Sequence, residues 1–336
     1  MAVVVVTRVP PPGDHGGDGA RVARALGLEV NEVLDLSASL NPLARDPRPV
    51  LARHLDAITR YPDPTPATRA LAAAMGVAPE RLLLTNGGAE AISLVAAVVG
   101  GSVVEPEFRL HPRGDGPRWR SNPHNPSGVL APRDARAAVW DEAFYPLATG
   151  QWTRGDDDAI VVGSLTKLLA CPGLRVGYVR GDPALLDACA RHQPHWSLNG
   201  LASEALADLL EPVDLARESA GVRVLREQLR DLLARHGLVA QPSDANWLLV
   251  ACPGLRDVLA HEAIVVRDCA SFAMPGVVRI AVPDERGLER LDDALTRVAP
   301  WLARTASAPR DGAFVPASPA PASPAPASPS SREGEK

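Results

Sequence analysis

Lysine is almost absent from this chain. Of its 35 basic residues only Lys167 and Lys336 are lysines, and Lys336 is the last residue. Lysine, unlike arginine, can lose its proton and form a Schiff base with an aldehyde. The internal lysine, in the stretch VVGSLTKLLACPGLRVGYV, is therefore a candidate for covalent chemistry. A solvent-exposed lysine, in a chain whose coding bias disfavours lysine generally, is the alternative.

Groups that suit a phosphate flank this lysine in the sequence. Ser164 and Thr166 precede it by three residues and one residue, and Arg175 follows it by eight. Arginine and hydroxyl groups are common partners of phosphate oxygens. An expected strand over residues 81–85 leads through Asn-Gly-Gly into an expected helix over 89–99, and a helix start also attracts phosphate. An ordinary tight turn would explain the glycines equally well. The chain has no GxxxxGK[ST] motif, so a nucleotide P-loop is not supported.

A carboxylate and an asparagine complete the set. Asp141, in VWDEAFYP, ends an expected strand, where α/β sheets form their ligand-binding crevice; a helix cap is the alternative role. Asn125 lies in the proline-rich turn NPHNPSG. Pyridoxal phosphate needs a lysine for its aldehyde, a carboxylate for its ring nitrogen, a donor for its ring oxygen and cations for its phosphate. The sequence therefore predicts a pyridoxal-phosphate site and no metal site.

Composition excludes several other classes of protein. The formal net charge is −5 and no basic block stands out, so we expect no nucleic-acid partner. The four cysteines form no CxxC pair, which indicates reduced thiols in a cytoplasmic protein. The apolar run of five residues at the start is too short for a signal peptide or a membrane span, and no later window is apolar enough.

The alternation of expected elements predicts an α/β fold. Helices and short apolar strands alternate between residues 66 and 181, which is typical of a mostly parallel sheet wrapped by helices. Strands over 246–252, 263–269 and 277–282, closed by a helix over 285–302, indicate a second, smaller α/β domain. From residue 305 the chain is rich in alanine, serine and proline, which predicts a disordered tail. We therefore predict an N-terminal arm that contributes to the small domain and the site, a large cofactor-binding domain, a small domain and a tail, over residues 1–45, 46–200, 201–304 and 305–336.

The ordered motifs NPHNPSG, DEAF, SLTKLLACPGLRVGY and VVRIAV resemble the class I/II aminotransferase family of fold type I, over roughly residues 14–300. The resemblance implies a pyridoxal-phosphate enzyme in which Lys167 holds the cofactor and Asp141 pairs with its ring nitrogen. Asn125 would bond the ring oxygen, and Phe108 would stack on the ring. The cofactor phosphate would lie among Gly88, Ala89, Ser164, Thr166 and Arg175.

The same resemblance implies a homodimer and a substrate site. Tyr61 would reach the cofactor phosphate of the neighbouring subunit, and Arg279 would bind the substrate carboxylate. The stretches DHGGD, LDLSASLNPL and HWSLN are similar to the threonine-phosphate decarboxylases of cobalamin biosynthesis, and AIVVRDC is shared with histidinol-phosphate aminotransferases. Arg267 would then lie by the substrate phosphate, and the residues lining that end of the site would include His15, Ser39 and Asn199. The expected reaction is decarboxylation of L-threonine O-3-phosphate; a transaminase, or a non-catalytic cofactor-binding relative, is the alternative.

Three departures from the family pattern bear on this expectation. Phe144 stands where many relatives have a tyrosine that bonds the ring oxygen, and Ser39 stands where the decarboxylases usually have asparagine. The segments 108–125 and 128–141 are also short, because a parallel crossover normally takes about 10–12 residues or more. We expect a trimmed large domain that keeps the cofactor residues.

Overall fold

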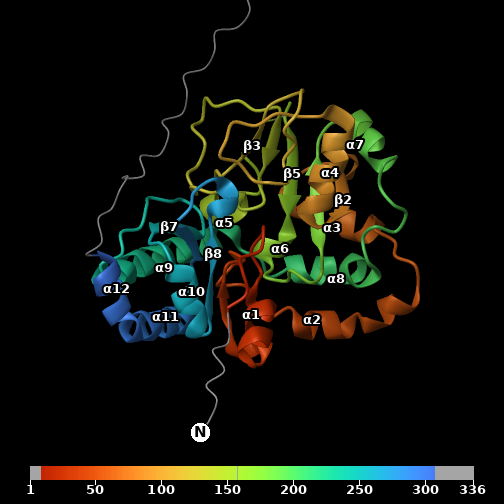
Figure 1. The fold of residues 1–336 in the computed structure, drawn as a ribbon. Helices are drawn as coiled ribbons and strands as arrows, with labels where there is room; N and C mark the ends of the chain where they lie inside the picture. The colour runs from red at the N-terminus through yellow and green to blue at the C-terminus, as the bar shows by residue number, and fades with distance from the viewer. Residues whose placement is uncertain (1–8, 157, 307–336) are drawn as a thin grey trace, which may run out of the picture.

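The computed structural model describes residues 9–156 and 158–306, which form two β-sheets with helices packed against them (Figure 1). The larger sheet is built from β2 (Leu82–Asn86), β3 (Trp119–Ser121), β4 (Val139–Asp141), β5 (Ile160–Ser164) and β6 (Val176–Arg180). Its strand order is β2-β6-β5-β4-β3. β6 is antiparallel to β2 and β5, whereas β5, β4 and β3 pair in parallel, so within this sheet only β6 opposes the common direction. The predicted α/β fold with a mostly parallel sheet is confirmed.

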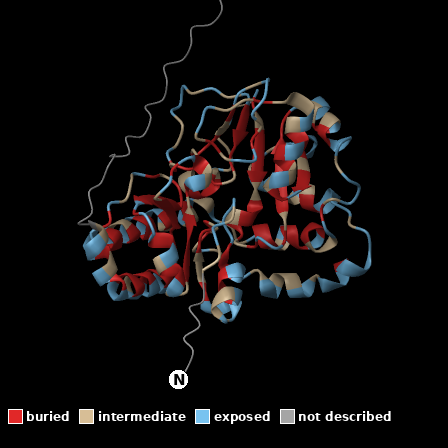
Figure 2. Ribbon diagram, viewed as in Figure 1, coloured by how far each residue is buried: buried red, intermediate tan, exposed pale blue. Residues whose placement is uncertain are grey.

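Helices cover both faces of the larger sheet. The covering helices are α4 (Gly87–Val99) and α7 (Pro183–Ala190) on one face, and α3 (Thr65–Met75), α5 (Tyr145–Thr149) and α8 (Gly200–Leu210) on the other. Successive residues of a strand point to opposite faces. Val162 and Val179 therefore pack against α4 and α7, whereas Val161 and Tyr178 pack against the opposite layer. Figure 2 shows the result, a buried sheet inside helices whose outer faces are exposed.

The smaller sheet joins the two ends of the chain. It contains β1 (Leu34–Leu36), β7 (Trp247–Ala251), β8 (Ile264–Asp268) and β9 (Val277–Ala281) in the order β1-β8-β9-β7. β1 pairs in parallel with β8, so the N-terminal arm supplies a strand to a sheet formed mainly by residues after 246. The helices packed around it are α1 (Gly19–Leu26), α9 (Leu215–Arg235), α10 (Leu255–His261), α11 (Glu285–Arg297) and α12 (Ala299–Ala306). The domain boundaries at residues 45, 200 and 304 stay predictions.

Two element ends differ from expectation. The strand predicted over residues 159–166 ends at Ser164, and the short helix α6 (Leu165–Leu168) begins at once. Lys167 therefore lies on a helical turn at the end of a strand. The tail predicted from residue 305 begins within the last turn of α12. Residues 1–8, which include the apolar run that was compared with a signal peptide, lie outside the described residues. Residues 307–336, which form most of the predicted tail, lie outside them as well.

Arginines bond the backbone of both short segments noted in the sequence, residues 108–125 and 128–141. Arg113 donates hydrogen bonds to four backbone carbonyls between Glu107 and His111, at 2.7–3.3 Å. Arg154 does the same for the segment before β4, where it bonds the carbonyls of Pro132, Arg133 and Ala135. Buried or half-buried carbonyls need such partners wherever the chain is too short to form helix or sheet. The two short segments thus lead into β3 and β4 without forming any helix before these strands.

Gly177 allows the first turn of α4 to lie against the sheet. A Cβ on Gly177 would come within 2.4 Å of the Gly87 carbonyl carbon and 2.6 Å of the Gly88 nitrogen. Both are backbone atoms, which cannot swing aside as a flexible side chain can. Gly177 is also paired with Ser164 at the end of β5. The helix start is thereby held beside the strand end that leads to Lys167.

Replacing Gly177 with alanine should lower the free energy of unfolding by about 1–3 kcal/mol, the usual cost of forcing an extra group into a packed contact. Gly173→Ala is the matched control, because a Cβ there has nothing within 4 Å, and its effect should stay within about 0.5 kcal/mol. Urea denaturation followed by circular dichroism measures both. Equal losses in the two variants would contradict this account of α4.

Candidate active site

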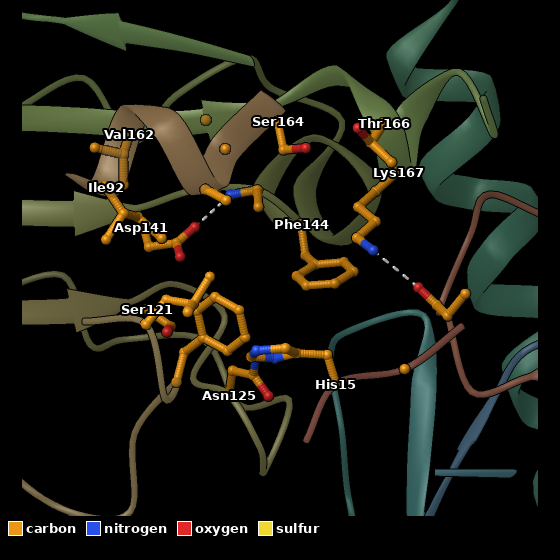
Figure 3. Close-up of a pocket in the computed structure, with 18 of the residues that line it drawn as sticks. His15, Ile92, Ser121, Asn125, Asp141, Phe144, Val162, Ser164, Thr166 and Lys167 are labelled. Carbon is orange, nitrogen blue, oxygen red and sulfur yellow. Dashed lines mark hydrogen bonds between the residues drawn. The ribbon is translucent and has the colours of Figure 1, made fainter. Parts of the chain in front are cut away.

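A cavity of about 290 Å³ opens between the two sheets. Side chains from the ends of β4 and β5, from the first turn of α4 and from the smaller sheet converge on it (Figure 3). Twelve residues that the sequence singled out line this cavity: His15, Gly88, Ala89, Phe108, Asn125, Asp141, Ser164, Thr166, Lys167, Arg175, Arg267 and Arg279. The tertiary structure therefore brings together residues that lie up to 264 positions apart in the sequence.

Lys167 points into the cavity from α6. Its Nζ donates a hydrogen bond to the Ala38 carbonyl at 3.1 Å and lies 5.6 Å from the centre of the Phe144 ring. Burial, and then the positive charges of Arg279 and Arg175, lower the pKa of Lys167 from 10.5 to about 8. A larger fraction of this amine is therefore neutral near physiological pH than of an ordinary lysine, which is the form that attacks an aldehyde.

Asp141 ends β4 and is held by a residue that sequence reasoning missed. Its Oδ2 lies 2.9 Å from Nε2 of His111, and its Oδ1 accepts a hydrogen bond from the Ala143 N–H at 3.0 Å. The other ring nitrogen of His111 faces the buried Glu107 carboxylate at 3.8 Å. His111 lies in none of the sequence motifs, and its spacing of three residues from Phe108 was its only local signal. The contact with His111 and the hydrogen bond from the Ala143 N–H together fix the orientation of the Asp141 carboxylate.

One corner of the cavity is suited to a phosphate group. A Cβ on Gly87 would lie only 2.4 Å from a terminal nitrogen of Arg175, so this guanidinium lies directly against the start of α4. The first N–H groups of a helix have no partner within the helix and attract anions. The buried Thr166 hydroxyl has no hydrogen-bond partner among the described residues. The groups that share this corner are Gly88, Ala89, Ser164, Thr166 and Arg175.

Two buried arginines face each other on the smaller sheet. Arg267 on β8 is paired with Arg279 on β9, and the two side chains enter the same cavity. Arg279 donates to Oδ1 of Asn125 at 2.8 Å, and burial together with Arg267 lowers the pKa of Arg279 to about 9. Arg267 donates to the Asp14 carbonyl and the Ser271 hydroxyl. Within the described part of the chain, neither guanidinium has a carboxylate partner, and Nε of each lacks any hydrogen-bond partner.

His15 and Phe108 lie on the same side of the cavity, with ring centres 5.8 Å apart. Burial and the charge of Arg267 lower the pKa of His15 below its usual value. The neighbouring Asp14 pairs with Arg109 at 2.9 Å, so the N-terminal arm is fastened at the mouth of the cavity by two arginines. The predicted proximity of His15 to Arg267 is therefore present.

Three residues expected at the site do not line the cavity. Ser39 is fully buried beside it, and its carbonyl accepts a hydrogen bond from Asn246. Asn199 caps α8 through its Oδ1, and its Nδ2 donates to the Leu174 carbonyl, so both polar atoms of the side chain are already hydrogen-bonded. Tyr61 is 77% exposed and stacks on Trp196. A substrate role for Asn199 stays a prediction, and its amide is used for local capping in this structure. Tyr61 would need a second subunit to act.

Comparison with known proteins identifies the family. Residues 119–295 match the family model for aminotransferase class I and II. Threonine-phosphate decarboxylase of Salmonella typhimurium is 30% identical, over 85% of this chain and 98% of that protein. This chain belongs to the class I and II aminotransferase family. It is an enzyme of the pyridoxal-phosphate-dependent type, and the resemblance inferred from its motifs is confirmed.

Further relatives include two kinds of enzyme. Histidinol-phosphate aminotransferase 2 of Ralstonia nicotianae is 27% identical, over 83% of this chain and 93% of that protein. Among solved structures, L-threonine-O-3-phosphate decarboxylase from Porphyromonas gingivalis has a TM-score of 0.68 and 22% identity, over 79% of this chain and 99% of that one. Histidinol-phosphate aminotransferase from Sinorhizobium meliloti, in complex with pyridoxal-5′-phosphate, has a TM-score of 0.70 and 17% identity, over 84% and 95%. These structures establish the shared fold.

The residues around the cavity suit pyridoxal phosphate. An amine of lowered pKa, a carboxylate oriented by a histidine, an unpartnered buried hydroxyl and an arginine against a helix start are the groups that this cofactor requires. Across the described ranges, no three His, Cys, Asp or Glu side chains gather in a way that could hold a metal ion. No helix in those ranges is both long and apolar enough to cross a membrane.

The Lys167 amine should titrate with a midpoint of about 8 in the cofactor-free chain. Arg279→Met should raise this midpoint by about 1 unit, because it removes a nearby like charge. Arg256→Met is the matched control, since Arg256 is equally buried but lies on α10, outside the cavity. The pH dependence of acetylation at Lys167, followed by mass spectrometry, gives the midpoint. An ordinary lysine midpoint in the native chain would refute the assigned environment.

Proposed function

We propose that this enzyme decarboxylates an amino acid whose side chain carries a phosphate, with L-threonine O-3-phosphate of cobalamin biosynthesis as the best candidate. The observation that carries the proposal is the pair of buried guanidinium groups of Arg267 and Arg279 in the Lys167 cavity, which have no carboxylate partner among residues 9–156 and 158–306. Two such cations suit a substrate with two acidic groups, a phosphate and an α-carboxylate. The similarity to threonine-phosphate decarboxylase of Salmonella typhimurium supports the same choice.

The proposed cofactor roles follow from the positions around the cavity. When bound, pyridoxal phosphate supplies an electron sink for the bonds of the substrate α-carbon. Lys167 would hold it covalently, and the free amine of this lysine, whose pKa is about 8, would be suited to carrying a proton. Asp141 would keep the ring nitrogen protonated, with His111 fixing the carboxylate. Phe144 places an apolar ring beside Lys167 where a tyrosine would add a hydrogen bond.

The proposed substrate roles decide the reaction. Arg279 would bind the α-carboxylate, and its bond to Asn125 at 2.8 Å ties this arginine to the residue expected at the cofactor ring. Arg267 would bind the phosphate with the nitrogens that have no partner in the described chain. Two fixed anchors prevent rotation about the substrate α-carbon. The bond held perpendicular to the cofactor ring is the one that breaks, so the anchors choose between loss of carbon dioxide and loss of a proton.

Transamination of a phosphorylated substrate is the second candidate. Histidinol-phosphate aminotransferase 2 of Ralstonia nicotianae is among the similar proteins, and a keto acid would also place a carboxylate on Arg279. Retention of Lys167, Asp141, Asn125 and Arg175 in one cavity argues against a non-catalytic relative, which has no use for all four. The two reactions leave the cofactor in different forms, which makes them separable by experiment.

The active unit is proposed to be a homodimer. Tyr61 and Trp196 form an exposed aromatic pair, 77% and 60% accessible, with Leu55 and Ile58 also exposed nearby in the sequence. An exposed apolar group of this kind is typical of a protein contact. A second subunit would give Tyr61 the proposed role at the cofactor phosphate. A fully active monomer in analytical ultracentrifugation would exclude this arrangement.

Arg267→Ala should raise KM for phosphothreonine by about 10- to 100-fold, because a hydrogen bond to a charged group contributes about 1.5–3 kcal/mol. KM for unphosphorylated threonine should change far less. Arg109→Ala is the control, because Arg109 is an exposed arginine and the contact with Asp14 is what it has in common with Arg267. Steady-state kinetics with both substrates provides the comparison. A similar rise for both substrates would remove Arg267 from the phosphate site.

A single turnover with phosphothreonine should release one equivalent of carbon dioxide and regenerate the aldehyde form of the cofactor. The physical reason is that the two arginines hold the carboxylate bond in the reactive orientation. Trapped carbon dioxide and the absorption spectrum are measured in the same experiment. Accumulation of the amine form without carbon dioxide would instead identify a transaminase.

A further inference from the structure

A four-residue segment of the N-terminal arm holds both ends of Lys167. The Ala38 carbonyl accepts the hydrogen bond from Nζ at 3.1 Å, and the Asn41 N–H donates to the Lys167 carbonyl at 2.9 Å. Between them the chain turns sharply, with Ser39 at a φ of 50°. The side chain and the backbone of this lysine are therefore positioned by residues far away in the sequence.

Asn41 uses its whole side chain in this arrangement. Its Nδ2 donates to the Leu168 carbonyl at 2.9 Å and to the Glu218 carboxylate at 2.8 Å, while its Oδ1 accepts from the Leu43 N–H at 3.0 Å. Because α6 is only four residues long, its carbonyls need partners from outside the helix. Asn41 supplies two of them, one from its backbone and one from its side chain.

Side chains from α9 and from the residue before β7 form hydrogen bonds with residues 38–41. Glu218 lies in the first turn of α9, and Asn246, just before β7, donates to the carbonyls of Ser39 and Leu40 at 2.8 and 3.2 Å. Asn246 is fully buried, and Asn41 is 4% exposed. Hydrogen bonds in such surroundings are costly to leave unmade, so the segment has little freedom to shift.

A second cavity lies behind α6. It has a volume of about 230 Å³, and its lining includes Leu168, Leu169 and Glu218. Thr166 and Lys167 line the active-site cavity, whereas Leu168 and Leu169 line this second cavity. Leu165, Leu168 and Leu169 are buried in the core of the larger sheet, so apolar packing holds the side chains of α6. The bonds from Asn41 act on a different part of α6, the backbone carbonyls of Lys167 and Leu168.

We infer that Asn41 and Glu218 are positioning residues that set where the Lys167 amine lies. Neither lines the active-site cavity. Glu218 orients the Asn41 amide, Asn41 holds the carbonyls of α6, and the same segment presents the Ala38 carbonyl to the amine. The inference rests on the role proposed for Lys167, although the contacts themselves involve no cofactor.

The experiment measures the pH midpoint for acetylation of Lys167 in the cofactor-free, full-length chain. The variants are Asn41→Ala, Glu218→Ala and Glu218→Gln, with Glu211→Ala as the matched control. Glu211 lines the same rear cavity but makes none of the bonds to Asn41. Measurements start at about pH 7, where Glu218, whose pKa burial raises to about 6, is mostly ionised.

Asn41→Ala and Glu218→Ala should raise the Lys167 midpoint from about 8 by about 1 unit, because a loosened α6 admits water to the amine. Glu218→Gln keeps an acceptor for Asn41 and should stay close to the wild type. Loss of the carboxylate charge alone would act in the opposite direction and lower the lysine pKa. The sign of the shift therefore separates repositioning from simple electrostatics.

A folded Glu218→Ala chain with an unchanged or lowered midpoint would overturn the inference, as would an equal rise in Glu211→Ala. Glu218 is only half-buried, so this variant remains informative if Asn41→Ala fails to fold. Failure of the proposed function would look different. A visible aldimine band that survives in purified Lys167→Ala without borohydride treatment would remove the lysine assignment, whereas the midpoints above would be unaffected.

Discussion

Buried positive charge that has no ion-pair partner in the described part of the chain is the constraint on which this structure depends. Lys167, Arg175, Arg267 and Arg279 enter one cavity, where Asp141 is the carboxylate in the lining. Charges taken out of water carry a desolvation cost of several kcal/mol each unless they are paired. The chain as a whole is acidic, so this concentration of cations is local. Phosphate and carboxylate groups of bound molecules are the natural partners that offset the cost, and binding them would stabilise the fold.

Each of the two sheets positions some of these charged residues. The larger sheet brings Asp141 and Lys167 to the ends of neighbouring strands, and the close approach at Gly177 fixes the start of α4 against the arginine of the phosphate corner. The smaller sheet contributes the arginine pair through the register of β8 and β9. The N-terminal arm joins both, because it adds β1 to one sheet and contacts Lys167 on the other. The site therefore exists only when the two halves are packed together.

The short segments of the larger sheet show how a reduced scaffold keeps such a site. Arg113 and Arg154 bond backbone carbonyls in the segments that precede β3 and β4, and these segments contain no helix. A single guanidinium has five donors in a fixed geometry, so it can organise a loop that lysine could not. The near-replacement of lysine by arginine in this chain is consistent with that use. His111, in the first of these segments, still reaches Asp141.

The sequence by itself determined the cofactor, the enzyme family and the α/β class, because these depend on residue types and on local patterns in the chain. The isolated Lys167, the acid that ends a strand at Asp141 and the arginine in VVRIAV could be recognised without coordinates. Only the tertiary structure decided that His111 supports Asp141, that Asn41 contacts the lysine helix and that Asn199 caps α8 instead of lining the cavity. The contacts of His111 and Asn41 join residues that are distant in the sequence, and Asn199 makes a local capping bond instead of an expected one. The spacing of residues along the chain does not predict which of several possible partners a side chain contacts after folding.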